Sequence, residues 1–218
     1  MNTMEEGLLF EKRDELNHPG VIVLRVADLE TIDIPRLDNP SLLEACKFVG
    51  ISLDVLKELL KSIPSFNGQE LENPEKFPFL DNQGNKEEDV ILWKVVLPGI
   101  GLTEVSVNTL YPPAVKDRDN ITLHLTTNGA SEKGDFEIIY CREGGFTLAF
   151  PMSVDPLALG VYVASPERNV ISFSPGTLVF IKAPHPNGWE AVTREPCQFT
   201  YICNPLWDPQ IAKRAVDA

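Results

Sequence analysis

The chain has 218 residues, of which 43% are hydrophobic and 23% are charged, and this ordinary globular composition excludes a chain that is disordered throughout. Its formal net charge of -13 disfavours binding to nucleic acid or anionic lipid, because both depend on clustered Lys and Arg. No apolar run approaches the roughly 20 residues that cross a bilayer, and the acidic N-terminus does not resemble a secretory signal. We therefore expect a cytoplasmic protein that binds neither nucleic acid nor membrane.

The first part of the chain predicts one strand and two short helices. Val21–Leu24 is an apolar run that follows a Pro-Gly pair, as is typical of a strand. Ser41 and Glu44 form a capping-box pattern, which predicts a helix that ends at Gly50. A second helix is predicted from Ser52 onward, where apolar residues repeat on one helical face.

The remaining sequence predicts a long loop followed by a β-rich unit. Residues 65–89 mix Pro, Gly, Asn and charge, which indicates a surface loop that could act as a linker or a lid. Beyond residue 90, ten short apolar or alternating runs follow one another without a helical period, and such a series is typical of an antiparallel sandwich or barrel. We expect an N-terminal unit over residues 1–89, packed on a β-barrel over residues 90–218 that closes with a short helical tail.

The ten apolar or alternating runs beyond residue 90 lie near residues 90–97, 104–110, 121–126, 136–141, 146–150, 159–164, 170–173, 177–181, 189–193 and 198–203.

The four cysteines show no C-x-x-C spacing, so a zinc site built from them is not expected. We predict that they are buried and reduced, as free cysteines usually are. Cys197 and Cys203 would lie on the same face of one strand.

His124 lies in the alternating segment Ile121–Thr126, on the same predicted face as the two threonines at positions 122 and 126. This face points either into a polar pocket or outward to water. The alternation suits both arrangements, since half-solvated strands of antiparallel sheets show the same pattern.

Two segments resemble the paired motifs of the cupin superfamily. Glu137 stands seven residues before Gly144, which is similar to the second half of the first cupin motif, where the glutamate faces inward and the glycine reverses the chain. Residues 175–189 are similar to the second motif, in which Gly176 holds the motif glycine and Asn187 replaces the metal-binding histidine. The resemblance covers residues 90–204 and implies a mainly β fold, a cupin-type antiparallel jelly-roll barrel with a small N-terminal helical extension.

The resemblance also implies a metal site, from which this sequence departs. Cupins use a His-x-His pair before the glutamate, and no histidine lies between residues 129 and 136. A divalent transition metal held by His124, Glu137 and His185 is one alternative, since imidazole and carboxylate suit such ions. The other is a barrel with no bound cofactor, which we favour.

The implied function is binding of a small organic molecule inside the barrel. Glu137 is the candidate catalytic group, because a carboxyl buried in an apolar barrel would have a raised pKa and could act as a general acid or base. The candidate ligand-binding residues are His124, Tyr140, Asn187 and Trp189. The hypotheses are an isomerase, lyase or cyclase and, alternatively, a non-catalytic binding or structural module, with a homodimer compatible with both.

Overall fold

The structure is a computed structural model. It describes residues 10–12, 20–26, 39–61, 74–80, 84–97, 99–112, 124–126, 136–151, 154–158, 161–164, 167–182, 187–193, 195–204 and 215–217.

Within these ranges the chain forms helices α1 and α2 and strands β1 to β15, arranged in three sheets. Every strand pairing except that of β10 with β15 is antiparallel. The expected mainly β class with a small helical extension is therefore confirmed. Neither of the described helices is long and apolar enough to cross a membrane.

The largest sheet has eight strands, in the order β1 (Phe10–Lys12), β2 (Val21–Val26), β12 (Thr177–Lys182), β7 (Phe136–Glu143), β14 (Cys197–Asn204), β5 (Gly101–Leu110), β4 (Lys86–Leu97) and β3 (Glu75–Leu80). The second sheet has four strands, in the order β11 (Arg168–Phe173), β8 (Phe146–Pro151), β13 (Asn187–Thr193) and β6 (His124–Thr126). The third has the order β15 (Ala215–Asp217), β10 (Val161–Ala164) and β9 (Val154–Ala158).

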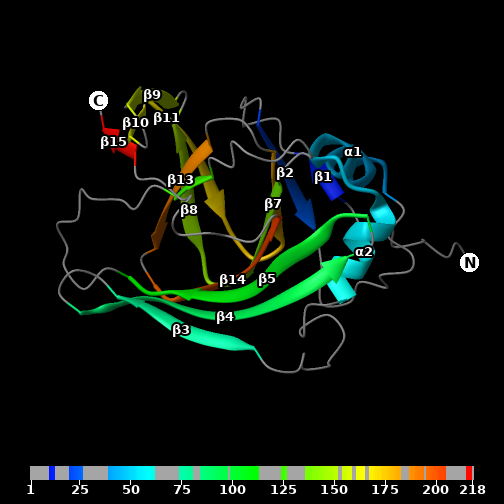
Figure 1. Ribbon diagram of the computed structural model, residues 1–218, viewed down its shortest axis with the longest axis horizontal. Coiled ribbons are helices and arrows are strands. Elements are labelled where there is room, and N and C mark those ends of the chain that lie inside the picture. The colour runs from blue at the N-terminus through cyan, green and yellow to red at the C-terminus, as the bar shows by residue number, and fades with distance from the viewer. Residues whose placement is uncertain are drawn as a thin grey trace, which may run out of the picture.

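The eight-stranded and four-stranded sheets face each other across an apolar core (Figure 1). Phe146 of β8 stacks on Phe173 of β11, with 4.7 Å between ring centroids, and contacts Phe199 of β14 at 5.3 Å. The alternating residues of β2, β12 and β7 complete this core from the other side. We call this side of the eight-stranded sheet its inner face.

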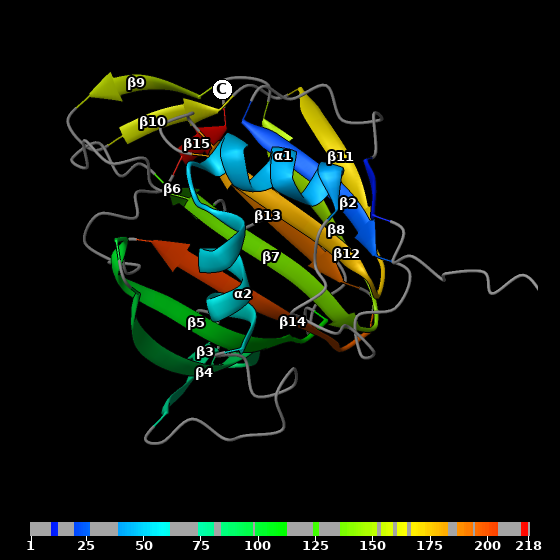
Figure 2. The ribbon, with the colours of Figure 1, turned by 90° about the vertical axis from the view of Figure 1, so that its right-hand side faces the viewer.

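The two helices cover the opposite, outer face of the eight-stranded sheet. Figure 2 shows α1 (Pro40–Val49) and α2 (Leu53–Lys61) in front of β12, β7 and β14. Leu42, Leu56 and Leu59 of the helices join a second core cluster, which includes the fully buried Phe180 of β12. Sheet residues therefore alternate between two apolar cores, which explains why strands such as β12 read as nearly continuous apolar runs.

The predicted helices are present, but the first starts differently than expected. Asn39 is the N-cap of α1, and its side-chain oxygen accepts a hydrogen bond from the Ser41 backbone N–H at 2.9 Å. Pro40 then occupies the first helical position, where its missing N–H costs nothing. Gly50 closes the helix at φ +80°, and Ser52 caps α2 through Val55 N–H, both as predicted.

Two other expectations were wrong. The predicted loop over residues 65–89 contains β3 and the start of β4, so residue 89 is not a structural boundary. The predicted C-terminal helix is not formed at Ala215–Asp217, which pairs with β10 as a strand. The remaining parts of both segments, residues 65–73, 81–83 and 205–214, lie outside the described residues.

The turn between β7 and β8 depends on a glycine, as predicted. Gly144 has φ +69°, a conformation that side-chain-bearing residues rarely adopt. A Cβ atom added there would lie 2.7 Å from the Pro196 carbonyl oxygen and 2.9 Å from Cys197 Cβ. The turn is therefore held against the start of β14, which fixes β7 beside that strand.

Candidate functional site

The candidate site lies on the inner face, where three neighbouring strands place polar residues in register. Cys203 of β14 is the direct partner of Glu104 on β5 and of Glu137 on β7. Directly opposed residues project from the same side of a sheet, so these three side chains form one row, which we call the carboxylate row. Their exposed fractions are 6% for Glu104, 1% for Cys203 and 3% for Glu137.

Tyr201 links the carboxylate row to the apolar core. It stands two residues before Cys203 on the same face of β14, and its hydroxyl lies close enough to Glu137 and Cys203 for both to raise its pKa. Because a phenol donates and a carboxylate accepts, the Tyr201 hydroxyl can donate a hydrogen bond to Glu137 when that carboxyl is ionised. A buried carboxylate is thus held next to a buried proton donor.

Burial controls the protonation of Tyr201. Desolvation raises the pKa of its hydroxyl well above the usual value of 10.0, and the neighbouring Cys203 and Glu137 raise it further. Tyr201 therefore keeps its proton throughout the neutral range. It can donate a hydrogen bond or a proton to a group beside Glu137.

The polar character continues along β5, away from the carboxylate row. Ser106 is the direct partner of Tyr201, and Asn108 is the direct partner of Phe199, so both lie on the inner face. Ser106 is fully buried and Asn108 is 8% exposed. The Asn108 side-chain N–H donates to Glu88 Oε1 of β4 at 2.7 Å.

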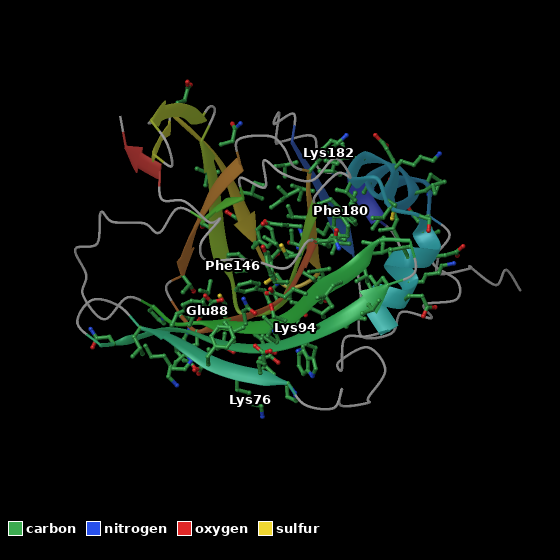
Figure 3. All side chains as sticks on the ribbon, viewed as in Figure 1. Lys76, Glu88, Lys94, Phe146, Phe180 and Lys182 are labelled. Atoms are coloured by element: carbon green, nitrogen blue, oxygen red, sulfur yellow. The ribbon has the colours of Figure 1, made fainter. Side chains whose placement is uncertain are left out.

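At this end of the face, Figure 3 shows Glu88 and Phe146 between the two sheets, while Lys76 projects from the other side of the large sheet.

Of the residues predicted for the site, Glu137 has the expected position and Tyr140 does not lie with it. Tyr140 belongs to the cluster under the helices, on the outer face. It stands three positions after Glu137, and alternation places the two residues on opposite faces of β7. The structure thus removes Tyr140 from a site around Glu137 and makes it part of the outer core.

The other predicted residues are described in part. The backbone of β6 pairs with that of β13, with His124 opposite Trp189 and Asn187 opposite Thr126, so the chain brings these three positions together at one end of the four-stranded sheet. The side chains of His124, Asn187 and Trp189 lie outside the described part of the structure, as does all of His185.

Metal binding through His124, Glu137 and His185 remains a prediction. Among the described residues, no group of three or more His, Cys, Asp and Glu side chains could hold a metal ion.

The sequence reasoning missed Glu104, Ser106 and Asn108. The strand itself was predicted, and its alternation of polar residues with Val105 and Val107 was a signal that one face is polar. That this face is the inner one follows only from the pairing of β5 with β14. The predicted common face of Cys197 and Cys203 is confirmed, since both lie in the inner core.

No protein-family model and no curated protein matches the chain. Among solved structures, it is similar to Streptomyces albus HEPD with 2-hydroxyethylphosphonate and Fe(II) bound, at 9% identity and a TM-score of 0.40, over 62% of this chain and 25% of the other. It is similar to Lactobacillus farciminis oxalate decarboxylase at 16% identity and a TM-score of 0.35, over 62% of this chain and 32% of that one.

A third similar structure is the Cupin_2 domain of an XRE family transcriptional regulator from Enterobacter cloacae, at 9% identity and a TM-score of 0.33, over 54% of this chain and 98% of that domain. The chain spans a quarter to a third of the length of the first two. At these identities and TM-scores the likenesses carry no argument about what the protein binds or does.

Proposed function

We propose that the protein binds a small organic molecule between its two sheets, against the carboxylate row, and that Glu137 and Tyr201 exchange protons with it. The observation that carries this proposal is the position of Glu137, which is 3% exposed on the inner face and close enough to Tyr201 to raise the pKa of its hydroxyl. Ionisable groups buried between sheets are costly to maintain, and they are concentrated at functional sites.

The pair is suited to acid–base chemistry on one substrate. An ionised Glu137 can take a proton from carbon or oxygen as a general base, while Tyr201 donates a proton or a hydrogen bond to an oxygen where negative charge develops. Such a combination serves isomerases, lyases and cyclases, in which a proton is removed at one atom and added at another. Glu104, across Cys203 in the same row, adds a second carboxylate to the wall.

A binding module without catalysis is the second candidate. It is favoured by the apolar side chains packed around Tyr201 and Cys203, because a ligand held there loses contact with water whether or not it reacts. In this case Glu137 serves as a hydrogen-bond acceptor for the ligand. The two candidates share the binding site and differ in turnover.

A thermal-shift screen against a library of metabolites tests the binding, because a ligand that binds only the folded state raises the melting temperature. Each compound that binds is then tested with Glu137→Gln and with Glu143→Gln, an exposed glutamate on the same strand. The proposal expects Glu137→Gln to weaken the shift and Glu143→Gln to preserve it. The proposal would be contradicted if no compound raised the melting temperature, or if the shift were weakened equally in both variants.

The enzyme and the binding module are separated by turnover. With a bound compound in hand, mass spectrometry of the incubated ligand reveals conversion by the wild type. Conversion that is lost in Glu137→Gln and kept in Glu143→Gln identifies an enzyme. Binding without conversion identifies a binding module.

Metal binding and dimer formation are proposals of their own. Elemental analysis of the purified protein, repeated with His124→Ala and His185→Ala, tests the metal: stoichiometric metal that both variants lose would support these ligands. Sedimentation velocity tests the homodimer.

A further inference from the structure

We infer that the bound molecule is neutral or cationic, is about the size of a five- to six-atom chain, and presents a hydrogen-bond donor to Asn108 and a hydroxyl or amine to Ser106 of β5. This inference rests on the proposed function, since it names the class of molecule that would bind on the inner face. Its central observation, two buried polar atoms, lies beside the carboxylate row.

Both residues carry a buried polar atom without a protein partner. Ser106 Oγ and Asn108 Oδ1 are shielded from solvent, and neither has a hydrogen-bond partner among the described residues. Leaving such an atom unsatisfied costs about 1 to 3 kcal/mol, and here two of them stand two residues apart on one strand beside the proposed site. Both lie on the inner face, beside Tyr201 and Phe199 respectively.

The orientation of the Asn108 amide follows from its neighbour. Its N–H group donates to Glu88 Oε1 at 2.7 Å, and a carboxylate can only accept, so the amide oxygen is the atom left for a ligand. An amide oxygen is an acceptor, and a ligand atom that binds it must therefore be a donor. Hydroxyl and amine groups meet this requirement, whereas a carboxylate or a dianionic phosphate does not.

The charges along the inner face also favour a ligand without negative charge. Glu88 binds Asn108 on one side, and Glu104 lies two residues before Ser106 on the other side, so carboxylates flank both polar atoms along the inner face. Lys94 is the direct partner of Glu104, but its positive charge is paired with Glu75, to which it donates a hydrogen bond at 2.6 Å. Negative charge on a ligand is repelled from a wall of this kind.

The spacing sets the size of the molecule. Ser106 and Asn108 are two residues apart on one strand, so the atoms that they present lie about 7 Å apart. A ligand that satisfies both needs a donor for Asn108 and a donor or acceptor for Ser106, separated by a chain of about five atoms. Hexose-sized polyols and short diamines meet this condition.

Three matched probes test the inference: pentane-1,5-diol, 1,5-diaminopentane and glutarate, which share a five-carbon length and differ in their end groups. NMR titration of the folded protein measures the affinity for each probe and locates it through the amide signals of β5. The diol or the diamine is expected to bind with shifts at residues 104–108, and glutarate at least tenfold more weakly. Glutarate binding as tightly as the others, or no probe shifting β5, would overturn the inference.

The variant Ser106→Ala provides a second test of the inference. Removing a buried hydroxyl that has no protein partner should raise the melting temperature by about 2 to 4 °C and weaken probe binding by about fivefold. Thr200→Val is the matched control, because Thr200 Oγ1 is also buried without a partner among the described residues, yet it lies on the outer face, opposite Val107 and Tyr140. It should raise the melting temperature in the same way and leave binding unchanged.

A lower melting temperature for Ser106→Ala with unchanged probe affinity would show that the hydroxyl serves the fold alone, and would overturn the inference. Failure here is distinguishable from failure of the proposed function. Metabolites that bind through Glu137 but are anionic and insensitive to Ser106→Ala would refute the ligand class and preserve the site. An empty metabolite screen would refute the site itself.

Discussion

Replacing Gly144 with alanine should destabilise the protein through two separate effects at the β7–β8 turn. The first is conformational: φ is +69°, and the left-handed region costs a residue with a side chain about 1 to 2 kcal/mol. The second is steric, because the new Cβ would approach the Pro196 carbonyl oxygen to 2.7 Å and Cys197 Cβ to 2.9 Å. Overpacking of this kind costs about 1 to 3 kcal/mol, so Gly144→Ala should lower the free energy of unfolding by about 2 to 5 kcal/mol.

Gly84→Ala is the matched control for the steric part. Gly84 has φ +82°, and a Cβ atom there would meet nothing within 4 Å. Urea denaturation of the two variants should therefore differ by about 1 to 3 kcal/mol, with Gly144→Ala the less stable. Equal losses in the two variants would refute the close packing of the β7–β8 turn against the first residues of β14, and with it the support that this turn gives to the strand that carries Glu137.

Three further predictions concern the cores and the buried ionisable groups. Phe180→Ala should lower the free energy of unfolding, measured by urea denaturation, by about 3 to 5 kcal/mol, because the ring is fully buried between β12 and the helices. Val170→Ala, at a position that is 61% exposed, should change it by about 0.5 kcal/mol or less. Because the fold raises the pKa of Tyr201, the hydroxyl ionises at a lower pH in the unfolded chain than in the folded protein. The free energy of unfolding should therefore be constant with respect to this group below pH 10 and fall above it by about 1.4 kcal/mol per pH unit. Tyr201→Phe should reduce this slope, and an unchanged slope in the variant would contradict the burial of Tyr201. All four cysteines are buried, so a thiol reagent should label them only on unfolding, and rapid labelling of the native protein would contradict the two cores.

Most strands after residue 90 could be predicted because they carry their own local signals, whereas β9 and β15 were not predicted. The expected run at 177–181 corresponds to β12, and the run at 136–141 corresponds to β7. Apart from Glu137 and Thr177, their buried residues are apolar on both faces, since one face packs on the helices and the other on the second sheet. Local composition is sufficient evidence for such strands.

Strand β3 could not be predicted in this way, because it is an edge strand. It pairs with β4 alone, and its exposed residues are charged or apolar without a clean alternation. Pro78 argues against a central strand, but an edge strand tolerates proline, since one side of its backbone needs no partner. The C-terminal strand was missed for a related reason: its pairing with β10 is a contact between distant segments, which leaves no local signal.

The candidate site was predictable at one residue and not at its neighbours. Glu137 was found through its spacing to Gly144, and alternation alone would have separated it from Tyr140. Glu104, Tyr201 and Glu137 come together only through the order β5-β14-β7. That order depends on strand pairing over long sequence separations, for which the sequence contains no local signal.

Carboxyl footprinting tests the central claim most directly, which is that Glu137 and Glu104 face the interior between two sheets. The folded protein is treated with a carbodiimide and an amine, and mass spectrometry then measures the labelling of each glutamate. The structure predicts slow labelling of Glu137 and Glu104, at 3% and 6% exposure, fast labelling of the exposed Glu75 and Glu143, and equal rates for all four in urea. Labelling of Glu137 as fast as that of Glu143 in the folded protein would contradict the inner carboxylate row and the function proposed for it.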